Sequence, residues 1–271
     1  MRVVDHLKSL GMGNREARDA LATGKVRLRG CPIADPGREI DPAEIVVDAN
    51  APRVTMGRDP FVLWKDRDLL ILWKPSGMLT VPAPGREDEP NALAWAGRLF
   101  GSAWPVHRLD EGTSGIMMVA LRREAQEAIK ALLERHAVDR RYLALVRGRF
   151  PDAITVDDTL VRDRGDGRRG PGAGGKRAIT HFRLVEPLQG ASLIEAKLET
   201  GRTHQVRIHA AKLGHPVFGD DLYGKDRGGR LALHAYRLVF QHPFATGREV
   251  RVEVPLADDL EAERRKRAIT R

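Results

Sequence analysis

Cysteine is almost absent from this sequence, since Cys31 is the single example in 271 residues. A disulfide bond within the chain and a zinc site built from cysteines are therefore excluded, and a reducing compartment is expected. Long apolar runs are also missing, because no stretch approaches the roughly 18 uninterrupted apolar residues of a membrane-spanning helix. The stretch from Met1 to His6 has no apolar core of signal-peptide length. We therefore expect a cytoplasmic protein that does not enter a membrane.

Negative charge is scarce relative to positive charge. The chain has 37 Asp and Glu against 46 Lys and Arg, which gives a formal net charge of +9. This excess favours a polyanionic partner, because cations that neutralise phosphates release condensed counterions. A merely basic surface is the alternative. The length permits one large domain, or a catalytic domain with a small module.

Residues 1–50 predict a small module that begins with two helices. Val4, Leu7 and Leu10 share one helical face. Asn14 is placed to cap a second helix, which ends at Gly24. The module therefore starts with a helical hairpin.

Short strands complete the module at 25–29, where residue types alternate, and at 45–47. The stretch from Val4 to Val47 resembles the αα-β RNA-binding domain of a ribosomal small-subunit protein, which many RNA-modifying enzymes carry at the N-terminus. Arg29-Gly30 stands where that family often has Asn-Gly. The module has five cations that could either face RNA phosphates or simply lie on a solvated surface. They are Arg15, Arg18, Lys25, Arg27 and Arg29.

A linker at 51–60, rich in proline and glycine, separates this module from a larger domain at 61–271. Residues 62–64 and 69–73 predict a hairpin with a buried second strand, and 123–136 predicts an amphipathic helix. Further strands are expected at 142–146, 179–185, 192–198, 205–209 and 231–240. Many strands with few helices between them indicate an α+β fold with a mixed, largely antiparallel sheet.

Residues 165–175 contain six glycines and a proline, flanked by several arginines and lysines. Such a composition offers no apolar side chains for a core. We therefore expect a mobile loop there, without an assigned role.

The segment from His107 to Ala120 contains the first chemical signal, a charged turn that leads into an apolar strand. Asp110 and Glu111 are adjacent, so in an extended chain they point to opposite faces and do not form a catalytic pair. Asp110 would have to act alone, as a nucleophile or as a base. The alternative is that it only closes a turn before Gly112.

A second segment, from Glu199 to His209, is dense in guanidinium and amide donors. In a strand, Gln205, Arg207 and His209 would share one face. An arginine that faces a partly buried carboxylate favours its ionised form and fixes its direction through bidentate hydrogen bonds. The two segments together therefore suit a lone aspartate nucleophile.

Both segments resemble the RluA-type pseudouridine synthases. The matching motifs are His-Arg-Leu-Asp-x-x-Thr-Ser-Gly at 107–115, Gly-Arg-Thr-His-Gln-Val-Arg at 201–207 with Leu-Gly-His-Pro at 213–216, Lys-Pro-Ser-Gly at 74–77 and Arg-Tyr-Leu-Ala-Leu-Val at 141–146. They occur in the family's order within residues 62–240. The resemblance implies a pseudouridine synthase fold for the larger domain.

The resemblance also implies roles for particular residues. Asp110 matches the catalytic aspartate, and Arg207 matches the arginine that pairs with it. Tyr142 matches the tyrosine that packs on the target uracil. Arg108 matches the arginine that takes the place of the flipped base in the RNA. Substrate contact is expected at a further set, in which the last three members could equally be scaffold: His107, Thr113, Arg202, His204 and Gln205.

The implied reaction converts uridine to its isomer pseudouridine. The bond from the ribose to uracil N1 breaks, the base turns, and its C5 bonds to the ribose. Because substrate and product are isomers, we expect no cofactor and no metal. A stacked base has to be flipped into a pocket, at a cost of about a few kcal/mol.

Several rival functions remain open at this point. A metal-dependent hydrolase could use His204, His209, His215, Asp220 and Asp221. An aspartyl phosphatase would need a second aspartate where Gly112 stands. A non-catalytic RNA-binding protein could retain the fold, and a synthase could act on transfer RNA. We expect a monomer that modifies structured RNA, with ribosomal RNA favoured by the N-terminal module.

Overall fold

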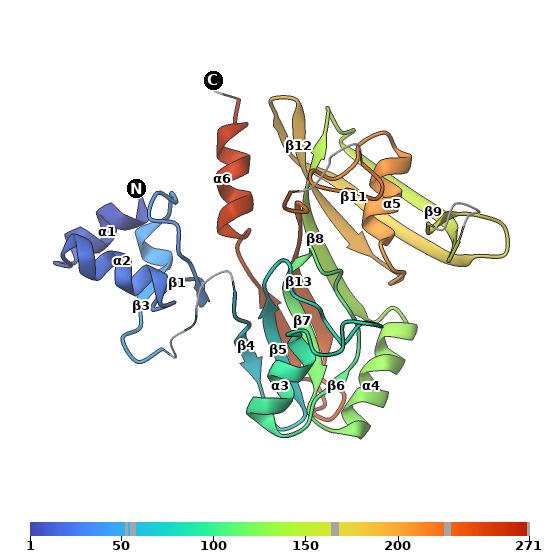
Figure 1. Cartoon of the computed structure of the whole chain (residues 1–271), viewed down its shortest axis with the longest axis horizontal. Coiled ribbons are helices and arrows are strands. Elements are labelled where there is room, and N and C mark those ends of the chain that lie inside the picture. The colour runs from blue at the N-terminus through green and yellow to red at the C-terminus, as the bar shows by residue number, and fades with distance from the viewer. Residues whose placement is uncertain (52–53, 55–57, 164–167, 225–228, 270–271) are drawn as a thin grey trace.

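The computed structural model describes residues 1–51, 54, 58–163, 168–224 and 229–269 (Figure 1). The strands of these residues form two separate sheets, one of three strands and one of eleven. The small sheet lies within residues 26–47, and the large sheet lies within residues 61–253. A small N-terminal unit therefore stands beside a larger body built on one sheet.

The N-terminal unit packs two helices against its three-stranded sheet. Apolar residues from the helices and strands share one core, which includes Val3, Leu21 and Val26. The sheet has the order β2-β1-β3 and is antiparallel. The element bounds are α1 Val3–Ser9, α2 Asn14–Ala22, β1 Val26–Leu28, β2 Cys31–Pro32, η1 Pro42–Glu44 and β3 Ile45–Val47.

The helical hairpin differs from its prediction in two details. Val3 and Leu7 form the buried face of α1, whereas Leu10 follows its last residue and is 58% exposed. A helix of seven residues is too short for its spacing pattern to choose between neighbouring faces. The prediction that Asn14 caps α2 is wrong, because Gly13 holds the N-cap position and Asn14 is the first helical residue.

The β1–β2 hairpin turns through Arg29 and Gly30. Leu28 pairs with Cys31, so the loop has two residues, and both have positive φ, 51° and 79°. This is the geometry that favours Asn-Gly in such hairpins. Arg29 adopts it while its guanidinium pairs with Glu44 at 2.6 Å.

The large sheet confirms the expected α+β class with a mixed, largely antiparallel sheet. Its main path runs β10-β9-β11-β12-β8-β13-β7-β5-β4, with β14 on β13 and β6 on β7. All described pairs are antiparallel except β7 with β13. The strand bounds are β4 Phe61–Lys65, β5 Leu69–Lys74, β6 Trp104–Pro105, β7 Ser114–Ala120, β8 Val138–Arg147, β9 Ala153–Val161, β10 Gly170–Pro171, β11 Lys176–Leu188, β12 Ala191–Leu198, β13 Leu233–Gln241 and β14 Glu249–Glu253.

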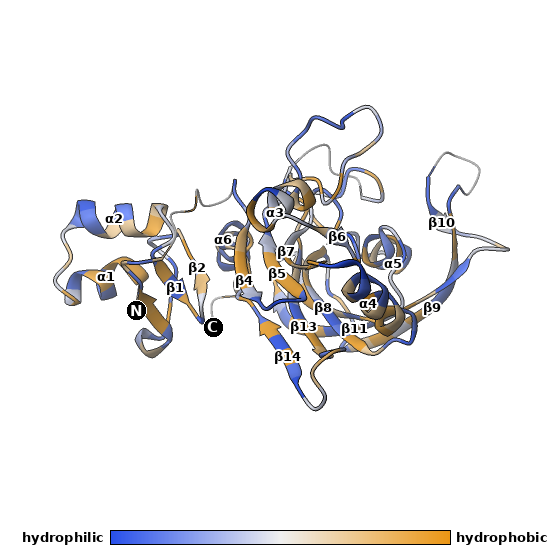
Figure 2. Ribbon diagram, turned by 90° about the horizontal axis from the view of Figure 1, so that it is seen from below, coloured by the Kyte–Doolittle hydropathy of each residue, from blue (hydrophilic) through white to orange (hydrophobic). Residues whose placement is uncertain are grey.

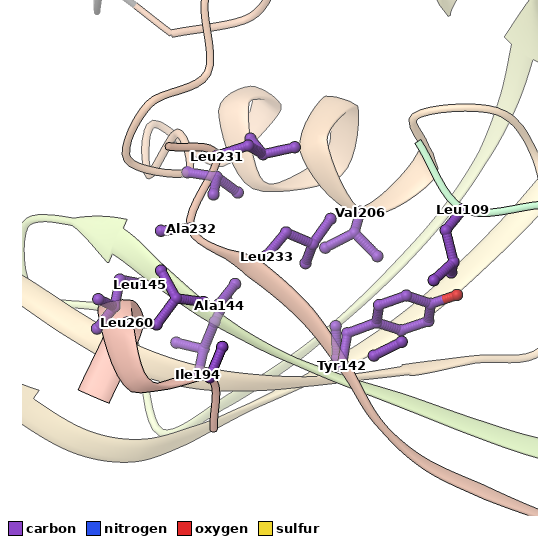
Figure 3. Close-up of a cluster of buried hydrophobic side chains, with 14 of the residues drawn as sticks. Leu109, Tyr142, Ala144, Leu145, Ile194, Val206, Leu231, Ala232, Leu233 and Leu260 are labelled. Atoms are coloured by element: carbon purple, nitrogen blue, oxygen red, sulfur yellow. The ribbon is translucent and has the colours of Figure 1, made fainter. Parts of the chain in front are cut away.

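Alternating side chains of the central strands feed cores on the two faces of the sheet. On β5, Leu70 and Leu72 join one core, while Leu69 and Ile71 join the other. This strand is therefore buried on both faces, as its continuous apolar run predicts. Figure 3 shows the first core near the site, where Tyr142 of β8 lies beside Leu109 and Leu233.

In the described part of the larger domain, four helices accompany the sheet, namely α3 Ala92–Phe100, α4 Arg123–Glu134, α5 Gln205–Lys212 and α6 Asp258–Lys266. The prediction of α4 is confirmed. The prediction of a strand at 205–209 is wrong, because this segment is the start of α5. Residues 205–210 are all buried, so apolar and polar residues alternate without the one-sided pattern that marks a surface helix.

The glycine-rich segment is partly described. Residues 165–167 lie outside the described residues. Gly170 and Pro171 pair with β9, and the amide of Gly172 donates to the Thr159 carbonyl at 3.0 Å. The expectation of a loop is therefore wrong for Gly170 and Pro171, which form β10, because the backbone supplies the hydrogen bonds although apolar side chains are missing.

The N-terminal unit contacts α6, beside which it lies in Figures 1 and 2. Asp258 accepts a hydrogen bond from Arg38 at 2.6 Å and one from the Ala34 amide at 2.6 Å. Arg265 forms an ion pair with Asp35. Within the described part of the chain, no helix has the length and apolar character needed to cross a membrane.

Candidate active site

The loop that carries Asp110 is held in place by residues at the end of β5. The Lys74 ammonium donates to the carbonyls of Pro75, Met78 and Glu111 at 2.9, 2.7 and 3.0 Å. The Ser76 hydroxyl donates to the Gly112 carbonyl at 2.7 Å. Lys74 is fully buried, and this burial lowers its pKa to about 7. The Lys-Pro-Ser-Gly motif therefore positions the loop.

Gly115 fixes the other end of this loop. It has a φ of 111°, and a Cβ atom there would lie 2.1 Å from the Ala235 carbonyl oxygen. This close approach is the parallel contact between β7 and β13. Only glycine permits it, so Gly115 fixes the place where the loop that follows Asp110 joins β7.

Arg207 reaches Asp110 from α5, but its planar fork holds a different carboxylate. Its Nε and Nη2 donate to Asp220 at 2.8 and 2.7 Å, while its Nη1 lies 3.4 Å from Asp110. The expected bidentate pairing of Arg207 with Asp110 is therefore wrong. The fork is already occupied, and one remaining nitrogen faces the catalytic candidate.

Asp220 is the residue that the sequence argument missed as a partner of Arg207. It is fully buried and also accepts hydrogen bonds from the amides of Leu222 and Tyr223, both at 3.0 Å. Burial alone would raise its pKa, but the hydrogen bonds and charge of Arg207 hold the pKa below its usual value. A stable carboxylate therefore orients Arg207. Its position in the Gly-His-Pro-Val-Phe-Gly-Asp stretch was the available signal.

The helix that carries Arg207 is attached to β11 through Thr180. The Thr180 hydroxyl contacts Gln205 Nε2 and His209 Nδ1, both at 2.9 Å. The side-chain oxygen of Gln205, Oε1, accepts hydrogen bonds from the Thr200 hydroxyl and from the Arg202 backbone amide. The side chain of Gln205 therefore holds this part of the fold together. Burial lowers the pKa of the neighbouring His209 to about 4.

His204 precedes this helix with a left-handed backbone, φ 59°. Its Nδ1 lies 3.0 Å from the Tyr223 hydroxyl, and its Nε2 lies 3.8 Å from Asp110. Burial lowers the pKa of His204, although the charge of Asp110 opposes this shift. A neutral imidazole therefore stands beside Asp110.

A cleft of about 470 Å³ opens above these groups, within the size range of ligand pockets. Arg207 lies behind Asp110 and does not line it. The other expected site residues are brought together in its wall, namely Asp110, Tyr142, Arg108, His107, Thr113, Arg202, His204 and Gln205.

The members of this wall differ in how free they are. Arg108 is exposed, whereas Tyr142 is 9% exposed and burial raises its pKa. His107 Nε2 accepts the Met118 amide at 3.0 Å, and burial lowers the pKa of His107 to about 3. The Thr113 hydroxyl is buried without a hydrogen-bond partner. His107 therefore braces the loop, and Thr113 Oγ1 is left available.

The five cations of the N-terminal unit are not equivalent. Arg15 and Arg18 are exposed on α2. Lys25 is half-buried, Arg27 donates to the Gly30 carbonyl at 3.0 Å, and Arg29 is paired with a carboxylate. Arg15 and Arg18 are thus the members best placed to meet an external anion.

The residues of the rival metal site do not converge. His209 binds Thr180, His215 Nδ1 lies 2.8 Å from the Arg147 carbonyl, and Asp220 binds Arg207. Among the described residues, the group with metal-ligand spacing is elsewhere and consists of Asp66, Asp68 and His242. The structure therefore does not provide, in its described part, the metal ligands that the hydrolase alternative requires.

Comparison with known proteins assigns the chain to a family. A sequence profile of the family described as RNA pseudouridylate synthase matches residues 68–212. A ribosomal large subunit pseudouridine synthase D of Zymomonas mobilis is 36% identical over 92% of this chain and 88% of its own length. An uncharacterized RNA pseudouridine synthase of Bacillus subtilis is 38% identical over 73% of this chain and 70% of its own length.

Solved structures agree with these relatives. The human RNA pseudouridylate synthase domain containing 1 protein superposes with a TM-score of 0.62 at 27% identity, over 76% of this chain and 88% of the other. The profile match spans Lys74, Asp110, Tyr142 and Arg207. The chain therefore belongs to the RNA pseudouridylate synthase family and is an isomerase that acts on RNA.

Proposed function

We propose that this chain converts uridine to pseudouridine in large-subunit ribosomal RNA, with Asp110 as the nucleophile. The observation that carries the proposal is the placement of Asp110 in the wall of the cleft, 3.4 Å from Arg207. The other carboxylate in this wall, Glu134, is exposed at the end of α4. Asp110 is therefore the carboxylate that a uracil ring enclosed in the cleft would contact.

The surrounding side chains suit the steps of the isomerisation. Asp220 holds Arg207 so that one guanidinium nitrogen lies 3.4 Å from Asp110. Tyr142 offers an aromatic face to an extruded ring, and exposed Arg108 can occupy the vacated position in the RNA. The C5 proton of uracil leaves and N1 gains a proton, so the atoms balance without a redox partner. The reaction itself therefore requires no cofactor.

Ribosomal RNA is the favoured target because of a relative and of the N-terminal unit. The Zymomonas mobilis relative is named for the large ribosomal subunit, and its similarity covers 92% of this chain. The exposed Arg15 and Arg18 give the unit a surface for RNA phosphates. We place the enzyme in the cytoplasm, where its single cysteine stays reduced.

The substitution Asp110→Asn tests the nucleophile. It keeps the shape of the side chain but removes its charge, so turnover should vanish while RNA affinity stays within about tenfold. Pseudouridine formation in a ribosomal stem-loop would be measured. Glu111→Gln is the matched control, because Glu111 pairs with Arg86 and is not part of the wall. Turnover above a few per cent in Asp110→Asn would refute the assignment.

A further inference from the structure

Arg140 is a buried cation in the wall of the cleft without a charge partner. It lies on β8, two residues before Tyr142, and is 8% exposed. Its Nε is buried with no hydrogen-bond acceptor. Within the described residues, no carboxylate lies at ion-pair distance from this guanidinium. An unpaired buried charge is costly, so it calls for a ligand.

The charged neighbours of Arg140 on β8, Asp139 and Arg141, pair on the opposite face with each other and with residues of the adjacent strands β12 and β13. Arg141 contacts Asp139 at 3.0 Å and Glu195 at 3.4 Å, and Arg237 contacts Asp139 at 3.0 Å. Successive strand residues point to opposite faces, so these carboxylates cannot serve Arg140. The face that contains Tyr142 therefore carries a positive charge that the protein itself does not neutralise.

Space for the guanidinium is reserved by a glycine of the Gly-Arg-Thr-His motif. A Cβ atom on Gly201 would lie 2.6 Å from Arg140 Nη1. Arg140 and Gly201 both line the cleft. The arginine is therefore held against the backbone of that loop, and its charge contributes with burial to the lowered pKa of His107.

We propose that Arg140 binds a phosphate of the substrate strand next to the target nucleotide. This inference rests on the proposed function, since it requires an RNA strand in the cleft. A phosphate supplies the full negative charge that the site lacks, and its oxygens match the planar donor fork of arginine. A base carbonyl would leave the buried charge uncompensated. The contact holds the backbone in the cleft while the base lies against Tyr142.

Binding of a ribosomal stem-loop to Asp110→Asn protein tests the contact without turnover. Arg140→Gln should weaken binding by about tenfold or more and reduce the salt slope by roughly one unit. Arg135→Gln is the matched control, because it changes the net charge equally from an exposed position outside the cleft. Equal losses in both variants would overturn the proposal, since the effect would then come from bulk charge.

Single methylphosphonate linkages beside the target uridine identify the phosphate. One such neutral linkage should weaken binding to the Arg140 protein and have no further effect on Arg140→Gln. Additive losses at every flanking linkage would overturn the contact. Arg140→Gln that lowers turnover but leaves RNA affinity unchanged would also overturn it, and would assign Arg140 to the positioning of Tyr142.

Gly201→Ala is a second variant that keeps the charge. Its methyl group should displace the guanidinium and abolish the same linkage effect, with thermal unfolding as a check that both variants fold. If the neutral linkage still weakens binding to Gly201→Ala as it does to the wild-type protein, the proposed geometry is contradicted. The wild-type protein could lose affinity for RNA with the neutral linkage, as proposed, and yet form no pseudouridine. That result would refute the proposed function but would leave the phosphate contact valid.

Discussion

The contacts of Arg207 show how the site divides its charges among single residues. Two of its nitrogens hold buried Asp220, and one lies near Asp110. Asp110 is therefore left able to face the cleft, because it is not locked into a two-bond pair. A nucleophile needs this freedom, whereas a structural carboxylate such as Asp220 does not.

Asp220→Asn should lower kcat by about tenfold or more and destabilise the fold by roughly 3 kcal/mol, because it breaks a buried ion pair. Single-turnover kinetics and urea unfolding measure the two effects. Asp221→Asn is the control, since the Asp221 side chain is 64% exposed and lies 3.6 Å from Arg207. Equal behaviour of the two variants would mean that Asp220 does not orient Arg207.

At the scale of elements, α5 is held in place by polar contacts. Thr180 on β11 contacts Gln205 and His209, which lie one helical turn apart. This arrangement brings the two residues to one face of a helix, although the sequence argument placed them on one face of a strand. The prediction that Arg207 shares their face is wrong, because residues two apart on a helix do not face each other, and Arg207 contacts Asp220 instead.

Thr180→Val should loosen α5 and with it Arg207. It removes one hydroxyl that serves two buried groups, so the free energy of unfolding should fall by about 1–3 kcal/mol, and kcat should fall with it. Thr155→Val is the control, because Thr155 contacts His181 from an exposed position. A stability loss without any change in kcat would show that α5 positions Arg207 independently of Thr180.

At the scale of the whole molecule, neutral histidines make the fold sensitive to acid. Burial lowers the pKa to about 3 in His107 and His234 and to about 4 in His209. Below pH 6.5 the unfolded chain binds protons that the folded chain does not, so stability falls as pH falls. Each histidine contributes about 1.4 kcal/mol per pH unit at most.

Urea unfolding between pH 7.5 and 4.5 measures this loss. The change of the unfolding free energy with pH should be shallower in His209→Gln, which removes one of the titrating groups. Carboxylates with lowered pKa add to the loss of stability below about pH 5, so the part of the curve between pH 7.5 and 5 reports on the histidines. An unfolding free energy that is the same at pH 7.5 and pH 5 would contradict the neutral state of these histidines.

Removal of residues 1–54 should leave a folded enzyme that is active on a small stem-loop at high RNA concentration. Its affinity for long RNA should fall, and each lost phosphate contact should reduce the salt slope by roughly one unit. Because Arg29 is paired with Glu44, the loss should match Arg15 and Arg18 more closely than all five cations. The full-length double variant Arg15→Gln/Arg18→Gln is the comparison. Equal salt slopes with and without residues 1–54 would exclude an RNA-docking role.

Strong local patterns allowed much of this protein to be predicted from its sequence. The apolar run of β5, the amphipathic α4 and the motifs around Asp110 and Arg207 each depend on neighbouring residues. Such patterns determine an element or a family without knowledge of what packs on it. They were sufficient for the fold class and the candidate nucleophile.

Only the tertiary structure decided the contacts that join distant segments. Arg207 takes Asp220 as its bidentate partner, α5 forms where alternation suggested a strand, and Arg140 meets Gly201 without a carboxylate. Each outcome depends on which backbone surrounds a side chain in three dimensions. Burial on all sides removes the one-sided pattern of a helix, and an ion pair is formed with whichever carboxylate the fold places closest.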